Sequence, residues 1–230
     1  MGEVTIKGKD GSFQAYLARP KITPAPGIVV AQEIFGVNQV MRDICDWLAG
    51  EGFVALCPDL FWRIEPGIDI TDKTQAEWDR AFELFGLFDV DDGIADMQAA
   101  LAALRGHEAC NGKAGSVGYC LGGKIAFLMA TRSDADCNVG YYGVGLRGLL
   151  GESGNISKPL LLHIAEQDKF SSPEEIAEVR DRLAGEAKVT VEVYAGQNHA
   201  FARLGGEHYD ATSAKRANER TVNFFKEHLA

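Results

Sequence analysis

The 230-residue sequence lacks the features that define several large classes of protein. No stretch approaches the roughly 18 to 20 apolar residues that a membrane-spanning helix needs. Basic residues are outnumbered, 23 against 33 acidic ones, and the net charge of −10 argues against nucleic acid or an anionic membrane as the main partner. A small anionic substrate is still allowed, because it needs only one or two well-placed arginines.

Repeats, low-complexity tracts and linker-like segments are also missing. The hydrophobic fraction of 46% and the charged fraction of 24% are those of an ordinary globular protein with a core of normal size. We therefore expect a single domain over residues 1–230.

Cysteines are few and show no C-x-x-C pair. Their odd number and scattered positions predict free thiols in a reducing compartment, and hence a cytoplasmic protein. The opening "MGEVTIKGKDGSF" does not read as a signal peptide, and Ile6 stands where a myristoylation motif needs Ser or Thr. No histidine pair has metal-ligand spacing, so we expect neither metal nor cofactor. The five cysteines are Cys45, Cys57, Cys110, Cys120 and Cys137.

Short apolar runs alternate with helical patterns along most of the chain. Continuous apolar runs between amphipathic helices predict an α/β fold, with a mostly parallel sheet covered by helices on both faces. The runs expected to be strands lie at 26–33, 53–59, 113–120, 137–145, 158–168 and 188–196. The expected helices lie at about 37–50, 72–86, 90–105, 122–132, 172–185 and 207–228, with no clear helix after 137–145.

The first 20 residues have a different pattern. "VTIKGKDGSFQAYLARP" alternates apolar and polar residues around the turn Lys9-Asp10-Gly11, which predicts an antiparallel hairpin at one edge of the sheet.

Cys120 stands between two glycines, in "GYCLG", where the strand should turn into a helix. This G-x-C-x-G pattern is the thiol version of the nucleophile elbow, a strained turn that presents a nucleophile at the carboxyl end of a strand. The amino end of the helix favours the thiolate, and the Leu121 amide can bind an oxyanion. A phosphate loop is excluded by Ile125, which stands where magnesium needs Ser or Thr. A buried structural cysteine is the other alternative, and it is the interpretation we give to the remaining four.

A catalytic thiol needs a base, and the base needs a partner that orients it. Asp168 and His199 each follow a predicted strand, in the order nucleophile, acid, histidine that the elbow fold requires. Taken alone, Asp168 could be a helix cap and His199 an exposed loop residue. His163 lies inside an apolar strand and is expected in the core. The remaining histidines read as surface residues: His107, His208 and His228.

"VAQEIFG", residues 30–36, ends an early strand, where this fold supplies a second oxyanion amide; Ile34 is the candidate. Glu33 is unexpected there, because a carboxylate near a thiol opposes thiolate formation. The alternative is that Glu33 is a surface charge at a strand end.

Five segments together resemble the dienelactone hydrolase (carboxymethylenebutenolidase) family of the α/β-hydrolase fold: "VAQEIFGVN", "CPDLFWR", "VGYCLGGKIAF", "AEQD" and "NHAFAR…ANERTVNFF". The resemblance implies a triad of Cys120, Asp168 and His199, with oxyanion donors at the Leu121 and Ile34 amides. It also implies that Glu33 pairs with Arg203, and that a substrate carboxylate engaging Arg203 frees Glu33 to take the thiol proton.

The sequence departs from the family pattern in the predicted substrate pocket. The family has an arginine and, four residues later, a tyrosine where this chain has Trp78 and Phe82; Arg80 is nearby but on another helical face. Together with Phe35 and Arg203, these residues are the candidate substrate-binding set. Losing a cation and a phenol weakens the match to a small dicarboxylate-like lactone, so a bulkier or less charged ester is an alternative substrate.

The sequence thus predicts a cofactor-free hydrolase of enol-lactones or small carboxylic esters that forms a cysteine acyl-enzyme. Its partner would be a small molecule bearing a carboxylate, and the chain would be a monomer or weak homodimer. The alternatives are a thioesterase or general carboxylesterase on the same triad, and a non-catalytic member that binds a carboxylate. A thiol-redox role is disfavoured because no second cysteine lies near Cys120 in sequence.

Overall fold

The computed structural model describes residues 2–230. They fall into two compact units, one ending at Gly115 and the other beginning at Ser116. The expectation of one domain over residues 1–230 stays a prediction.

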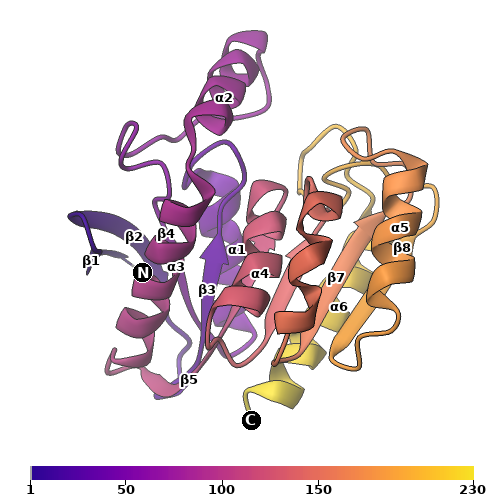
Figure 1. Cartoon of the computed structure of the whole chain (residues 1–230). Helices are drawn as coiled ribbons and strands as arrows, with labels where there is room; N and C mark the ends of the chain where they lie inside the picture. Colours follow the sequence, from indigo (N-terminus) through magenta and orange to yellow (C-terminus); the bar gives the residue numbers. More distant parts are fainter. Residues whose placement is uncertain (1) are drawn as a thin grey trace. The chain divides into compact units, whose positions relative to one another are not determined.

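The first unit combines an antiparallel hairpin with a parallel pair of strands, in the order β1-β2-β4-β3 (Figure 1). β1 and β2 pair antiparallel around the predicted turn, where the Gly8 amide donates to the Gly11 carbonyl over 2.8 Å. β2 also runs antiparallel to β4, whereas β3 and β4 are parallel. The four strands are β1 (Gly2–Lys7), β2 (Ser12–Ala18), β3 (Ala25–Ala31) and β4 (Val54–Pro58).

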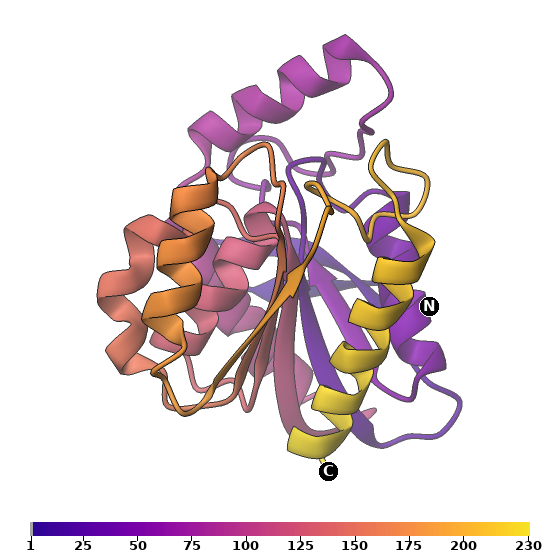
Figure 2. The ribbon, with the colours of Figure 1, turned by 90° about the vertical axis from the view of Figure 1, so that its right-hand side faces the viewer.

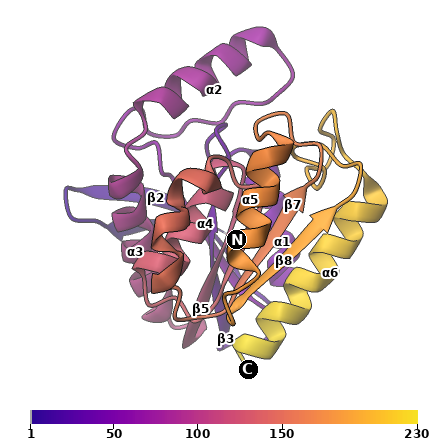
Figure 3. The same ribbon diagram turned by 45° about the vertical axis from the view of Figure 1, so that its right-hand side comes forward.

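Helices cover both faces of these strands. α1 (Gln39–Gly50) and α3 (Val90–Arg105) both pack on β3 and β4, from opposite faces, while α2 (Gln75–Leu87) stands away from the strands of its unit (Figure 3). Each of the three helices begins at a residue whose side chain accepts a backbone N–H of the first turn, which satisfies donors that the helix leaves free. These three residues are Asn38, Thr74 and Asp89.

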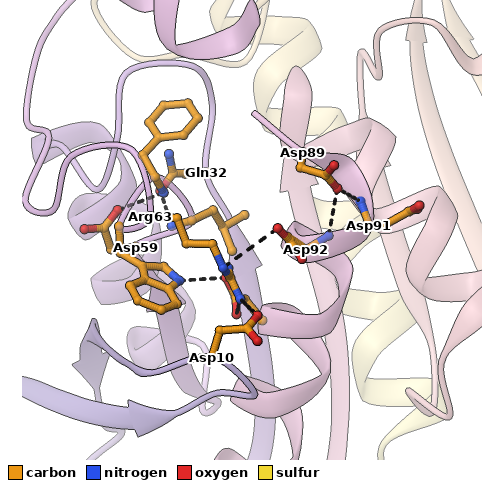
Figure 4. A network of polar contacts seen from close by, with 11 residues as sticks. Asp10, Gln32, Asp59, Arg63, Asp89, Asp91 and Asp92 are labelled. Atoms are coloured by element: carbon orange, nitrogen blue, oxygen red, sulfur yellow. Dashed lines mark hydrogen bonds and ion pairs between the residues drawn. The ribbon is translucent and has the colours of Figure 1, made fainter. Parts of the chain in front are cut away.

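A polar network around Arg63 ties the hairpin turn and the segment after β4 to α3 (Figure 4). Arg63 pairs with the buried Asp96 on α3 and with Asp10 in the turn. The Trp62 indole donates to the same Asp96 carboxylate over 2.8 Å, and the Arg63 guanidinium lies 4.4 Å from the Trp62 ring centre. Two donors therefore compensate the burial of one carboxylate.

Replacing Asp96 with leucine should lower the free energy of unfolding by about 2–4 kcal/mol, because Arg63 and Trp62 lose a buried acceptor. Urea unfolding measures the change. Asp92→Leu is the matched control, because that carboxylate is half exposed and lies 3.9 Å from Arg63; it should cost no more than about 1 kcal/mol. Equal losses in both variants would contradict a dominant role for Asp96.

The second unit is a parallel array in the order β5-β6-β7-β8, in which β5 (Cys110–Tyr119) begins before the boundary between the units. Its other strands are β6 (Asn138–Tyr141), β7 (Leu160–Ala165) and β8 (Val189–Tyr194). Because the strands are parallel, the loops that follow them gather at one edge of the array. This edge is where the sequence analysis placed its catalytic candidates.

Helices also cover both faces of this array. α6 (Ala211–His228) lies on one face, and α4 (Leu121–Arg132) and α5 (Pro173–Leu183) lie on the other (Figure 2). α5 begins with the predicted Ser-Pro start, and Ser172 and Glu175 form a reciprocal capping box. After β6 the chain forms a 3₁₀ segment, η1 (Leu146–Asn155), where no clear helix was expected. The predicted fold class, a mostly parallel α/β sheet with helices and an antiparallel N-terminal hairpin, is confirmed.

Within residues 2–230, no helix has the length and apolar character needed to cross a membrane.

Candidate active site

Cys120 occupies a sharp turn between a strand and a helix of the second unit. β5 ends at Tyr119 and α4 begins at Leu121, so that Cys120 alone makes the turn, with φ 57° and ψ −112°. A non-glycine residue at positive φ is strained, and such strain persists only where the surroundings hold it. Here the Cys120 amide donates to the Tyr141 carbonyl of the neighbouring strand over 3.1 Å. This backbone is the elbow that the sequence predicted.

The glycines around Cys120 are required by backbone contacts. A Cβ atom at Gly118 would lie 1.8 Å from the Gly122 carbonyl oxygen, and one at Gly123 would lie 2.4 Å from that of Tyr141. The strand and the first turn of α4 therefore approach more closely than any side chain allows. The first glycine of the G-x-C-x-G pattern, Gly118, follows from this packing.

Asp168 and His199 meet beyond the ends of β7 and β8. His199 Nδ1 lies 2.8 Å and 3.0 Å from the two carboxylate oxygens of Asp168, and both side chains are buried. Since an ionised carboxylate can only accept, Nδ1 carries the proton. Asp168 also accepts the Phe170 amide over 2.9 Å, which holds its carboxylate in place. His199 Nε2 is buried and forms no hydrogen bond of good geometry with any residue from 2 to 230.

The electrostatic surroundings of His199 favour its charged form. Burial lowers the pKa of His199, but the Coulombic interaction with Cys120 and the hydrogen bond to Asp168 raise it to about 9. Cys120 and His199 thus form a coupled pair, with Asp168 on the opposite side of the imidazole.

Aromatic side chains that the sequence analysis did not single out enclose this imidazole. Phe170 packs edge-on against His199 with ring centres 4.6 Å apart, and Tyr142 does so at 5.1 Å. Tyr142 is strained, with φ 37°, directly after β6. Its signal in the sequence is its place at the end of a predicted strand, in "GYYGVG". The two rings limit access of water to the Asp168–His199 pair.

A small cavity of about 50 Å³ adjoins Asp168 on the side of η1 and α5. Its walls include Tyr142, Phe170, Leu146 and Ile176. The space is large enough for a few water molecules but too small for a substrate.

Glu33 and Arg203 are charged residues with buried side chains. Glu33, in the first unit, follows β3 and is 2% exposed; Arg203, in the second unit, follows His199 and is 7% exposed. The alternative that Glu33 is a surface charge is therefore wrong. Burying a charge costs free energy unless neighbouring groups compensate it, so we expect such groups around the side chains of Glu33 and Arg203. The sequence pattern could not show this, because a strand end can face either water or protein.

The remaining candidates of the first unit include a row of aromatic rings, which we call the aromatic row. Phe35 packs edge-on against Trp78 at 5.1 Å, and Trp78 stacks on Phe82 at 5.6 Å. Phe35 is buried next to Ile34, whereas Phe82 is 47% exposed. Arg80 forms ion pairs with Glu65 and Glu83 instead of joining the row.

The other cysteines and His163 have the structural roles expected of them. The five cysteines are free thiols, and burial raises the pKa of Cys45 and Cys137, which keeps these thiols protonated. His163 is fully buried between the Tyr194 and Thr221 hydroxyls, 2.9 Å and 3.0 Å away, and burial lowers its pKa to about 3. His163 is therefore a neutral core residue.

A known family model describes nearly the whole chain: that of the dienelactone hydrolase family matches residues 13–229. The chain belongs to the dienelactone hydrolase family. A candidate carboxymethylenebutenolidase from Azospirillum brasilense is 53% identical over 241 residues, covering 100% of both chains. The carboxymethylenebutenolidase of Pseudomonas putida is 39% identical over 96% of this chain and 94% of its own.

Solved structures agree with this assignment. A candidate dienelactone hydrolase from Klebsiella pneumoniae superposes with a TM-score of 0.85 over 98% of each chain, at 27% identity. This member of the dienelactone hydrolase family therefore has the α/β-hydrolase fold. It is a carboxylic ester hydrolase, which confirms the reaction class predicted from the sequence and makes a non-catalytic carboxylate binder the weaker alternative.

Proposed function

We propose that this enzyme opens enol-lactones or cleaves related small esters through a thioester on Cys120. The Cys120 sulfur attacks the carbonyl carbon, and a tetrahedral intermediate forms. When it collapses, the C–O bond breaks and protonated His199 gives its proton to the leaving oxygen. His199 then takes a proton from water, which attacks the thioester. The C–S bond breaks, and the products are a carboxylic acid and the Cys120 thiolate.

The observation that carries this proposal is the state of His199. Its Nδ1 is hydrogen-bonded to Asp168 over 2.8 Å, and Cys120 and Asp168 both contribute to a pKa raised to about 9. A protonated His199 held in place by Asp168 can give its proton to the leaving oxygen. A thiolate is also the reactive form of cysteine.

The oxyanion would be bound by backbone amides. Leu121 is the first residue of α4, and the N–H groups of a first helical turn point outward with the positive end of the helix dipole. The family resemblance assigns the second amide to Ile34. Such preorganised donors contribute about 3–4 kcal/mol each to the stabilisation of the tetrahedral intermediate.

The experiment that tests the acyl-enzyme is a burst assay. Incubation with p-nitrophenyl acetate should release one equivalent of nitrophenol rapidly, and mass spectrometry should locate the acetyl group on the peptide that contains Cys120. Prior alkylation with iodoacetamide should abolish the burst. Steady hydrolysis with Cys120 unmodified at all times would contradict the proposal.

We further propose that Glu33 takes the thiol proton when a substrate carboxylate engages Arg203. A buried carboxylate that loses its cationic partner has a raised pKa and becomes a better base. Glu33 and Arg203 are both buried. The pKa of a buried carboxylate responds strongly to a change in its charged partner, which supports this proposal.

Glu33→Gln should therefore slow acylation by about 100-fold while the substrate Kd changes less than about threefold, because general-base catalysis contributes about 10² to 10⁴ in rate. Stopped-flow bursts measure acylation, and equilibrium binding to an alkylated enzyme measures Kd. Glu65→Gln, at an exposed position on the surface, is the control. Unchanged turnover in Glu33→Gln would rule the proton-transfer role out.

The substrate that fits the aromatic row is less polar than a small dicarboxylate. Trp78 and Phe82 present rings where the family pattern has a cation and a phenol, and Phe35 packs against Trp78. The guanidinium of Arg80 is engaged by two glutamates. An ester with one carboxylate for Arg203 and an aryl or alkyl group for the row should give a higher kcat/KM than a small dicarboxylate lactone. Trp78→Arg should reverse that order.

A further inference from the structure

A single side-chain oxygen joins the two loops that carry Asp168 and His199. Asn198 Oδ1 accepts the Lys169 backbone N–H over 3.0 Å and the His199 backbone N–H over 2.7 Å. One partner is the residue next to the acid, and the other is the histidine itself. Asn198 is half-buried, so these bonds are partly shielded from water.

Other bonds between the same loops lie farther from the imidazole. The Gln167 N–H donates to the Gln197 carbonyl, and the Gly196 N–H donates to the Glu166 carboxylate, each over 2.8 Å. These two bonds hold the loops together where they leave β7 and β8. The Asn198 oxygen adds a further link, between the residue that follows Asp168 and His199 itself.

The backbone directly after His199 is strained, and the hydrogen bonds of Asn198 can hold it in this conformation. Ala200 has φ 62°, a conformation that costs an alanine roughly 1–2 kcal/mol. A strained turn relaxes unless its surroundings hold it, and relaxation here would rotate the His199 backbone. The Asn198 oxygen binds the His199 N–H on the other side of that residue.

We propose that Asn198 is a positioning residue: it sets the separation of the acid and histidine loops, and thereby the hydrogen bond between Asp168 and His199. This inference rests on the proposed triad function. Without the carboxamide, two N–H groups lose their acceptor, the loops separate, and the bond from His199 Nδ1 to Asp168 lengthens. That bond helps to raise the pKa of His199, so its loss lowers the pKa and leaves the imidazole misaligned.

Three variants distinguish positioning from a general structural role. Asn198→Ala removes the shared acceptor. Asn198→Asp keeps an acceptor oxygen in a side chain of the same shape, replaces the NH2 group with a second oxygen, and adds a negative charge near His199. Gln197→Ala is the matched control, because the neighbouring residue contributes its backbone carbonyl and not its side chain to the connection.

Asn198→Ala should lower the kcat for hydrolysis of p-nitrophenyl acetate by about 10- to 100-fold with KM changed less than about threefold, since small displacements of catalytic groups have effects of this size. NMR titration should show a lowered pKa for His199. Asn198→Asp should recover most of the activity and move the same pKa upward. Gln197→Ala should resemble the wild type in all three measurements.

An Asn198→Ala enzyme within threefold of Gln197→Ala in kcat, with an unchanged His199 pKa, would overturn the inference. So would an Asn198→Asp enzyme as slow as Asn198→Ala. If the alanine variant does not fold, Asn198→Ser decides, because its shorter hydroxyl cannot accept both N–H groups as the carboxamide does: a lowered kcat with a lowered His199 pKa supports positioning, and wild-type values of both overturn it. Failure of the proposed function would be seen in the burst assay instead, as a wild-type enzyme in which Cys120 is never acylated.

Discussion

Alanine in place of Cys120 should lower kcat/KM for ester hydrolysis by at least about 10⁴-fold, because the loss of a nucleophile leaves only the contribution of substrate binding and oxyanion stabilisation. Cys120 lies in the elbow beside an imidazole whose pKa it helps to raise to about 9. No other described cysteine occupies such a turn. Initial rates and bursts with p-nitrophenyl acetate measure the loss.

The matched control is Cys137→Ala, which removes a thiol that burial keeps protonated. That variant should retain wild-type rates and lose only some stability from the small cavity, about 1 kcal/mol. A Cys120→Ala enzyme that keeps more than about one tenth of the wild-type rate would show that hydrolysis does not need the thiol. Cys120→Ser would then reveal whether a hydroxyl supports the reaction.

The same variant tests the electrostatic coupling. The Coulombic interaction with Cys120 raises the pKa of His199, whereas burial lowers it, so removing the sulfur should lower the pKa of His199 below about 9. The hydrogen bond to Asp168 remains and still favours the charged form. NMR titration of the imidazole in the wild type and in Cys120→Ala gives the shift directly. An unchanged value would mean that the sulfur is not the source of the raised pKa.

Gly118→Ala is expected to prevent the enzyme from folding, or to lower its free energy of unfolding by more than about 4 kcal/mol. The new Cβ would lie 1.8 Å from the Gly122 carbonyl oxygen, and neither backbone segment can move without displacing β5 or α4. Relief of this clash would pull Cys120 out of its strained conformation. Any folded protein should therefore also have lost its activity.

Urea unfolding and hydrolysis assays check this pair of effects. Gly151→Ala is the control, because an alanine side chain at that position meets nothing within 4 Å; it should change stability by less than about 1 kcal/mol. A Gly118→Ala enzyme with normal stability and activity would show that the elbow tolerates a wider separation of strand and helix.

Some features of the site could be predicted from neighbouring residues in the chain. Cys120 was recognised because two glycines flank it at a strand-to-helix junction, and the first of them, Gly118, leaves no room for a Cβ atom. The order of Asp168 and His199 followed from two strands that each end just before them. Parallel strands place such loop residues at the same edge, so topology and sequence order were enough to expect them together.

Other features depended on residues that are distant in sequence. Nothing in "AQEIFG" distinguishes a buried Glu33 from an exposed one, and the burial of its carboxylate depends on segments that pack around it. The two rings on His199 and the oxygen of Asn198 that binds Lys169 likewise join residues about 30 to 60 positions apart.

Local patterns were sufficient for the strands, the helices, the hairpin and the placement of one sulfur, because periodicity and turn chemistry involve residues only a few positions apart. The pKa of His199, by contrast, depends on the folded structure and could not be predicted from the sequence. Burial, the Asp168 bond and the attraction to Cys120 together set the pKa of His199. Each of them arises from contacts between distant parts of the chain, and electrostatic interactions depend on separation in space and on exclusion of water.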